Sequence, residues 1–281
     1  MPGSRTNLGS VDRSVLAQAR VQAHSAAQWA SKIGRANLPA LADDSHSNLG
    51  WDAGLQALLG QPLTETSPSI QFGVQLQELQ LIVVTELGTE TLSLAGTSEV
   101  DAGSWVDDKA RALGLRPASE AEMPYALDPL DRYASVPAQA LAELAEWFDL
   151  AAELLTGVAD SLVDVSPGAS PVRCWPHHFD IATLIRLEPG DPETARSLGV
   201  GLSPGDGAYG EPYFYVTPWP PLEGAASLDL GGVGHWHTEG FSAGVLTRTE
   251  LGDADEVGRV AGEFLSSVVT LTTSFLRGKT R

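Results

Sequence analysis

The stretch "SIQFGVQLQELQLIVVTELGTETLSLAG", residues 69–96, decides the fold class. In its first part, apolar side chains alternate with glutamine or glycine, which is the period of a half-buried strand. These apolar residues are Ile70, Phe72, Val74 and Leu76. The second part holds two strand-like runs joined around Leu87-Gly88-Thr89, which predicts a hairpin. Residues 69–96 therefore predict an antiparallel sheet.

Segments with the periodicity of a helix precede and follow residues 69–96 in the sequence. Residues 11–33 and 254–276 repeat their apolar residues near every 3.6 positions, which is typical of amphipathic helices. Residues 104–114 begin at a serine that can cap and end at a glycine that can terminate a helix. The Ala- and Leu-rich residues 136–163, with Pro137 near the first turn, predict a long central helix.

Further strands are expected at residues 172–187, 198–203, 212–218 and 235–249. The order of helix, strands, helices, strands and helix predicts an α+β fold. We expect a mostly antiparallel sheet covered by helices, with long N-terminal, central and C-terminal helices. Residues 1–281 are expected to form a single integrated domain, in which the proline-broken stretch 117–136 separates two layers, 1–136 and 137–281.

The composition excludes several kinds of partner. Seventeen basic and thirty-six acidic residues give a net charge of −19, which repels nucleic acid and anionic membranes. The N-terminus has no apolar signal region, and no run approaches the roughly 20 apolar residues of a membrane span. Cys174 is the only cysteine, and its thiol is expected to be a small buried apolar group. We expect a soluble cytoplasmic protein.

Four of the six histidines lie in two strand-like stretches, "RCWPHHFDIATL" (173–184) and "GHWHTEGFSAGVL" (234–246). In a strand, His178 and Asp180 would share one face, and His177 would point to the other. Cys174 and His178 would lie about 13 Å apart, too far for a thiol–imidazole pair. In the second stretch His235, His237 and Glu239 would share a face.

These spacings predict a metal site. Imidazoles together with carboxylates suit zinc or non-haem iron, and a metal-bound water would then attack a small-molecule substrate. The predicted ligands are His235, His237, His178 and Asp180. The predicted catalytic side chains are Glu239, Tyr213 and Glu211, and further pocket candidates are His46, His177, Tyr215 and Asp44.

A second hypothesis needs no metal. Histidines beside aromatic residues in strands are often tethered by a hydrogen bond from a ring nitrogen to a carbonyl or carboxylate. The protein would then be a non-catalytic small-molecule-binding or structural protein, in which the histidines form a polar core network. The loop "DDSHSNLGWD", residues 43–52, could close over the sheet and bring His46 to the other histidines, or it could simply cap a helix.

Four motifs resemble an uncharacterised bacterial family known as a domain of unknown function. They are "DDSHSNLGWD", "WPHHFDIA", "SPGDGAYGEPYFYVTPWP" and "GHWHTEGF". The resemblance spans nearly the whole chain and implies one integrated unit, and it implies no known activity. The pair His235-x-His237 also resembles the histidine pairs that cupins carry on strands, but the position of Glu239 departs from their spacing, and the cupin fold is not implied.

Overall fold

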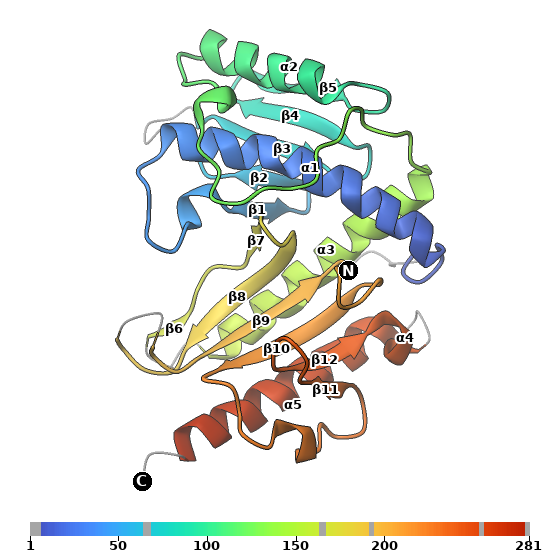
Figure 1. The fold of residues 1–281 in the computed structure, drawn as a ribbon, viewed down its shortest axis with the longest axis vertical. Helices are drawn as coiled ribbons and strands as arrows, with labels where there is room; N and C mark the ends of the chain where they lie inside the picture. Colours follow the sequence, from blue (N-terminus) through green and yellow to red (C-terminus); the bar gives the residue numbers. More distant parts are fainter. Residues whose placement is uncertain (1–6, 64–68, 163–166, 191–193, 253–255, 279–281) are drawn as a thin grey trace. The chain divides into compact units, whose positions relative to one another are not determined.

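The strand pairs that the described residues form are antiparallel, and helices of 25, 24 and 22 residues accompany the strands. These observations come from a computed structural model, which describes residues 7–63, 69–162, 167–190, 194–252 and 256–278 (Figure 1). The α+β class with an antiparallel sheet is therefore confirmed. Within the described residues, no helix is both long and apolar enough to cross a membrane.

The chain divides into two compact units. Unit 1 consists of the described parts of Met1–Ser10, Leu150–Val172 and Asp180–Arg281, and unit 2 consists of those of Val11–Asp149 and Arg173–Phe179. The main passage from unit 2 to unit 1, between Asp149 and Leu150, lies 13 residues after the expected division at residue 136. The chain completes most of unit 2, passes into unit 1 within a single helix, and returns to unit 2 for seven residues.

Unit 2 is a meander of strands with a long helix against it. Its elements in chain order are α1 (Arg13–Asn37), β1 (Leu49–Asp52), β2 (Ala57–Gly60), β3 (Gln71–Gln75), β4 (Gln80–Thr85), β5 (Gly88–Ser93), α2 (Glu99–Ala112), the first half of α3 (Ala138–Ser161) and β7 (Arg173–Trp175). β1 to β5 pair in sequence order, and β7 pairs with β1 through Leu49 and Cys174.

The helices of unit 2 begin at capping residues. The Asp12 carboxylate accepts from the Ser14 N–H at 2.8 Å, and the Ser98 hydroxyl accepts from the Asp101 N–H at 3.0 Å, which satisfies amide groups that a helix start leaves unpaired. α1 then packs on β2 and β3 (Figure 1). Its buried side includes five alanines, which let its backbone approach the sheet: Ala19, Ala23, Ala26, Ala27 and Ala30.

Unit 1 contains the remaining strands of the chain and a long C-terminal helix. Its elements are the second half of α3, β6 (Gly168–Ala169), β8 (Asp180–Arg186), β9 (Ser197–Ser203), β10 (Tyr213–Trp219), β11 (His235–His237), β12 (Ala243–Thr247), α4 (Arg248–Leu251) and α5 (Val257–Gly278). The strand order is β11-β12-β10-β9-β8, with β6 paired to β8. α5 contacts β9, β10 and β12 (Figure 1).

The two faces of the unit 1 sheet differ in chemistry. The face toward α5 is apolar: a Cβ on Gly244 would lie 2.9 Å from Val268, and Leu198, Val200 and Leu202 alternate along β9. On the other face, paired positions carry small and polar side chains. Gly201 stands between Ala182 and Tyr215, and Tyr215 and His235 both pair with Val245. This second face carries the predicted site residues that lie on strands of unit 1, which are Asp180, Tyr213, Tyr215, His235 and His237.

The expected continuous strand over residues 172–187 is wrong. Residues 176–179 form a turn, in which the Phe179 N–H donates to the Trp175 carbonyl at 2.7 Å and Phe179 takes a left-handed φ of 59°. His177 and His178 are therefore neighbours in a turn and do not point to opposite faces of a strand. We call residues 176–179 the histidine turn.

Other strands and helices also begin or end at residues that differ from the predicted ones. Residues 235–249 form two strands, β11 and β12, that pair with each other, and the short helix expected at 104–114 begins earlier, at Glu99. The polar loop expected at 43–52 ends in β1, and β1 and β2 were not expected at all. The hairpin of β4 and β5 and the long helices α1, α3 and α5 agree with the predictions to within a few residues at their ends.

Candidate functional site

In unit 1 the two histidines of β11 share one tyrosine hydroxyl. The Tyr209 oxygen lies 2.8 Å from His235 Nε2 and 2.8 Å from His237 Nδ1. His235 Nδ1 lies 2.9 Å from Glu250 Oε1, and His237 Nε2 lies 2.6 Å from the Glu239 carbonyl oxygen. All four ring nitrogens are thus engaged in hydrogen bonds. We call these four side chains, Tyr209, His235, His237 and Glu250, the tyrosine–histidine network.

The partners fix the direction of two of these hydrogen bonds. A carbonyl oxygen can only accept, so His237 Nε2 donates to Glu239. An ionised Glu250 can also only accept, so His235 Nδ1 donates to its carboxylate. The Tyr209 hydroxyl has one hydrogen, so it donates to one of the two rings and accepts from the other.

Glu250 is held in its ionised form. Burial alone would raise its pKa, but hydrogen bonds from the Thr247 N–H, from His235 and from the Thr247 hydroxyl hold the pKa below its ordinary value. The same carboxylate closes a capping box with Thr247 at the start of α4. Glu250 is therefore the carboxylate of this site. Glu239, which was expected in that role, lies beyond the end of β11 and contributes only its backbone carbonyl.

The other predicted residues of unit 1 have separate partners. The Tyr213 hydroxyl donates to Asp206 at 2.6 Å, and burial raises the pKa of Tyr213. The Tyr215 hydroxyl donates to Asp180, and the Thr249 hydroxyl donates to Glu211 at 2.7 Å. Tyr209 packs on Tyr213, and His237 stacks on Phe241 with ring centroids 4.0 Å apart. The face is a connected aromatic layer in which the polar ends are paired.

This arrangement differs from the predicted metal centre. An ion between His235 and His237 would have to displace the Tyr209 hydroxyl. Across the described residues, no three His, Cys, Asp or Glu side chains are grouped so that they could hold an ion. His178 belongs to the histidine turn of unit 2, and Asp180 belongs to β8 of unit 1.

Unit 2 holds a second polar group of side chains, on α1. His24, Gln28, Ser31 and Arg35 follow one another at helical spacing, and we call them the α1 polar stripe. His24 Nε2 and Gln28 Nε2 donate to the Pro176 carbonyl at 2.7 and 2.8 Å, which attaches the histidine turn to the helix. His24 also stacks on Phe179, and burial lowers the pKa of His24.

Tyr125 and the histidine turn both contact this stripe at Gln28. The Tyr125 hydroxyl donates to Gln28 Oε1 at 2.8 Å, and its ring centroid lies 5.8 Å from that of His177. Partial burial, with a smaller effect of His178, lowers the pKa of His177 to about 4. Burial raises the pKa of Tyr125 to about 12. Both side chains are therefore neutral at neutral pH.

The loop "DDSHSNLGWD" reaches this group through Asp44. Asp44 Oδ1 lies 3.1 Å from the Arg35 guanidinium, and both charges act on the pKa of His177. His46 was expected near the histidines, but its Nδ1 accepts from the Leu41 N–H at 3.2 Å and its side chain is buried in the turn against α1. The structure thus brings together two of the pocket candidates, Asp44 and His177.

Two buried donors in this group have no partner at hydrogen-bond distance within the described residues. They are the hydroxyl of Ser31, a residue with 0% exposure, and the Nε–H of Arg35. The Ser31 hydroxyl lies near enough to the Tyr125 oxygen to lower the pKa of Tyr125 as a hydrogen bond does, and the charge of Arg35 also lowers that pKa. We call Ser31, Arg35, Asp44, Tyr125 and His177 the α1 polar cluster. His177 is exposed and the Asp44 side chain is 49% exposed, so the cluster runs from the surface to a buried end.

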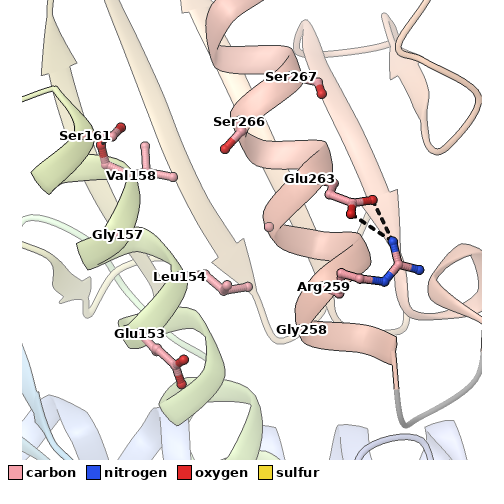
Figure 2. A pocket seen from close by; sticks show the side chains of 11 residues that line it. Glu153, Leu154, Gly157, Val158, Ser161, Gly258, Arg259, Glu263, Ser266 and Ser267 are labelled. Atoms are coloured by element: carbon pink, nitrogen blue, oxygen red, sulfur yellow. Dashed lines mark hydrogen bonds and ion pairs between the residues drawn. The ribbon is translucent and has the colours of Figure 1, made fainter.

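A groove of about 710 Å³ lies within unit 1, between the second half of α3 and α5 (Figure 2). Glycines and serines form much of its lining, including Gly157, Gly258 and Gly262. The charge of Arg259 is neutralised by Glu256, just before α5, at 2.5 Å and by Glu263 of α5 at 2.8 Å (Figure 2 shows the pair with Glu263). The groove therefore offers no buried polar group that could select a ligand.

Comparisons of the chain with protein-family models, with curated proteins and with solved structures give no significant match. The two polar groups described above are therefore interpreted from their own chemistry.

Proposed function

We propose that the protein binds a small molecule at the α1 polar cluster without transforming it. The observation that carries this proposal is the pair of buried donors, Ser31 Oγ and Arg35 Nε, that have no partner at hydrogen-bond distance within the described residues. Leaving such a group unpaired costs about 1–3 kcal/mol, and native proteins seldom do so without a functional reason. An oxygen atom of a ligand that accepts from both groups would remove this cost.

The tyrosine–histidine network supports the non-catalytic part of the proposal. Its ring nitrogens and its hydroxyl are hydrogen bonded to protein groups, so they tether Tyr209 and β11 to the sheet. A general base must reach a substrate proton, and a metal ligand needs a free lone pair. In this network every ring nitrogen is already engaged by the Tyr209 hydroxyl, the Glu250 carboxylate or the Glu239 carbonyl.

A thermal-shift screen of uncharged and charged metabolite-sized compounds tests the proposal. Ser31→Ala removes a buried hydroxyl that has no partner, so the ligand-free variant should be more stable than the wild type by about 1–3 kcal/mol. Ser104→Ala, at an exposed position of α2, is the matched control and should gain only the helix preference of alanine, at most about 0.7 kcal/mol.

Compounds that stabilise the wild type should stabilise the Ser104→Ala variant equally and the Ser31→Ala variant much less. If Ser31→Ala is no more stable than its control and every hit stabilises both variants alike, the cluster is not a binding site.

A metal-dependent reaction on a small molecule is the second candidate function. One observation favours it: His235 Nε2 and His237 Nδ1 converge on one point, the Tyr209 oxygen. Metal analysis of protein purified without an affinity tag, followed by zinc and iron(II) titration, decides between the two functions. Stoichiometric uptake that shifts the resonances of both rings would favour the metal enzyme.

A further inference from the structure

We propose that the ligand of the α1 polar cluster is an uncharged, flat molecule with an amide-like edge, in which a carbonyl stands beside an N–H. This inference rests on the proposed function and specifies the chemical class of its ligand. Three independent features of the cluster support it: its net charge, the order of its donors and acceptors, and its aromatic walls.

The net charge of the cluster is zero. Arg35 carries one positive charge, and Asp44 compensates it at 3.1 Å. His177 and Tyr125 are neutral at neutral pH because their pKa values are about 4 and about 12. A charged ligand would enter without a compensating partner, in a chain whose net charge of −19 further disfavours an anion. The cluster therefore favours an uncharged ligand.

The Arg35–Asp44 pair presents a donor beside an acceptor. The Arg35 Nε–H is free to donate, and a neighbouring nitrogen of the same planar guanidinium already contacts Asp44. A carboxylate has more lone pairs than this single contact uses, so Asp44 can still accept from an N–H. The complement of a donor next to an acceptor is an acceptor next to a donor, as in an amide. The Ser31 hydroxyl supplies a second donor to the carbonyl oxygen.

Aromatic rings surround the exposed part of the cluster. The ring centroid of His177 lies 5.8 Å from Tyr125, 6.2 Å from Trp175 and 4.1 Å from His178. Rings at such separations form stacked or edge-to-face contacts with one another, and they can offer the same contacts to a flat ligand. An aromatic carboxamide or a lactam ring meets all three requirements.

A matched pair of probes tests this inference: benzamide, which is neutral, and benzoate, which has the same ring but carries a charge. Binding to the full-length protein is followed at pH 7 through the ring resonances of His177 and Tyr125. We expect benzamide to bind at least about tenfold more tightly than benzoate. Ser31→Ala should weaken benzamide binding, whereas Ser104→Ala should leave it unchanged.

The Asp44→Asn variant tests most directly whether the charge balance of the cluster sets the preference for a neutral ligand. Asp44 has a left-handed φ of 57°, which asparagine accepts well, so the backbone should be retained. The variant leaves Arg35 uncompensated, so the preference should move toward benzoate and benzamide should lose its advantage. Asp108→Asn makes the same change of charge at an exposed position of α2, and the preference for benzamide should remain.

The outcomes separate this inference from the proposed function. Tighter binding of benzoate by the wild type, at the same resonances, would overturn the ligand class and leave a small-molecule site in place. Lack of response to either probe, while hits of the thermal-shift screen still depend on Ser31, would also overturn the ligand class. If the screen also gives no Ser31-dependent hit, the proposed function fails together with the inference.

Discussion

Tyr215 of β10 crosses over Gly201 of β9, and its hydroxyl donates to Asp180 of β8. A Cβ at residue 201 would lie 2.5 Å from the Tyr215 oxygen and 2.8 Å from the Ile181 carbonyl oxygen. Because real Cβ atoms do not approach so closely, only glycine lets this side chain span the neighbouring strand. The hydrogen bond between β10 and β8 thus depends on a missing side chain on the strand between them.

Gly201→Ala should destabilise the protein by about 1–3 kcal/mol, the usual cost of overpacking. Gly199→Ala is the control on the same face of the same strand, where the nearest atom to a new Cβ lies 3.9 Å away. It should be neutral or stabilising by up to about 1 kcal/mol, because glycine weakens a strand. Urea unfolding measures both variants, and equal effects would contradict the close approach at Gly201.

Tyr209→Phe should destabilise unit 1 by about 1–3 kcal/mol, because the change leaves His237 Nδ1 and His235 Nε2 without a hydrogen-bond partner. Tyr213→Phe, which loses a single hydrogen bond to Asp206, is the comparison. Nitrogen NMR of the wild-type rings should show a proton on His237 Nε2 and on His235 Nδ1, which face groups that can only accept. A His237 Nε2 without a proton would contradict the hydrogen bond to the Glu239 carbonyl.

Glu250 should make stability sensitive to acid. Its pKa in the folded protein is lower than in the unfolded chain, so its contribution is complete above the unfolded value of about 4.3 and is lost as the pH falls through the folded value. Glu250→Gln should therefore reduce the loss of stability below about pH 4.3. Unfolding curves at several pH values give the slopes, and identical slopes for the two proteins would refute this role.

His177 should act in a higher range of pH. Its pKa is about 4 in the folded protein and about 6.5 in the unfolded chain, so the unfolded chain binds more protons between these values. Stability should consequently fall as the pH drops from about 6.5 toward 4, and His177→Gln should lessen that fall. NMR titration of the His177 ring should give a midpoint near 4, and a midpoint near 6.5 would contradict the packing around it.

Regular periodicity explains the parts of the fold that the sequence predicted. Alternation over residues 70–76 and helical spacing over residues 11–33 follow directly from burial of one face. The turns were harder to predict because the residues with left-handed φ are not glycine. Gln56, Leu79 and Phe179 end three four-residue turns of this kind, so the usual turn signal is absent.

The candidate site was predicted only in part, for similar reasons. Asp44 and His177 were selected by residue type, but Ser31, Arg35 and Tyr125 have no distinctive motif. The spacing of His24, Gln28, Ser31 and Arg35 on a predicted helix was a usable signal, because it places a polar row along one side. The Thr-x-x-Glu pattern at Thr247 was a second usable signal in the sequence. It is typical of a capping box, which would have placed Glu250 beside the end of β12.

The route of the chain through α3 has a consequence for synthesis on the ribosome. Strand β7, which pairs with β1, is made only after the chain has passed through residues 150–172 of unit 1. At about 5–20 residues per second, β1 keeps an unpaired edge for a few seconds after residue 149 has been added. Unit 2 is thus exposed to strand exchange with a neighbouring nascent chain until residues 173–179 emerge. Slow codons placed over residues 150–172 should increase aggregation during synthesis without altering the finished protein.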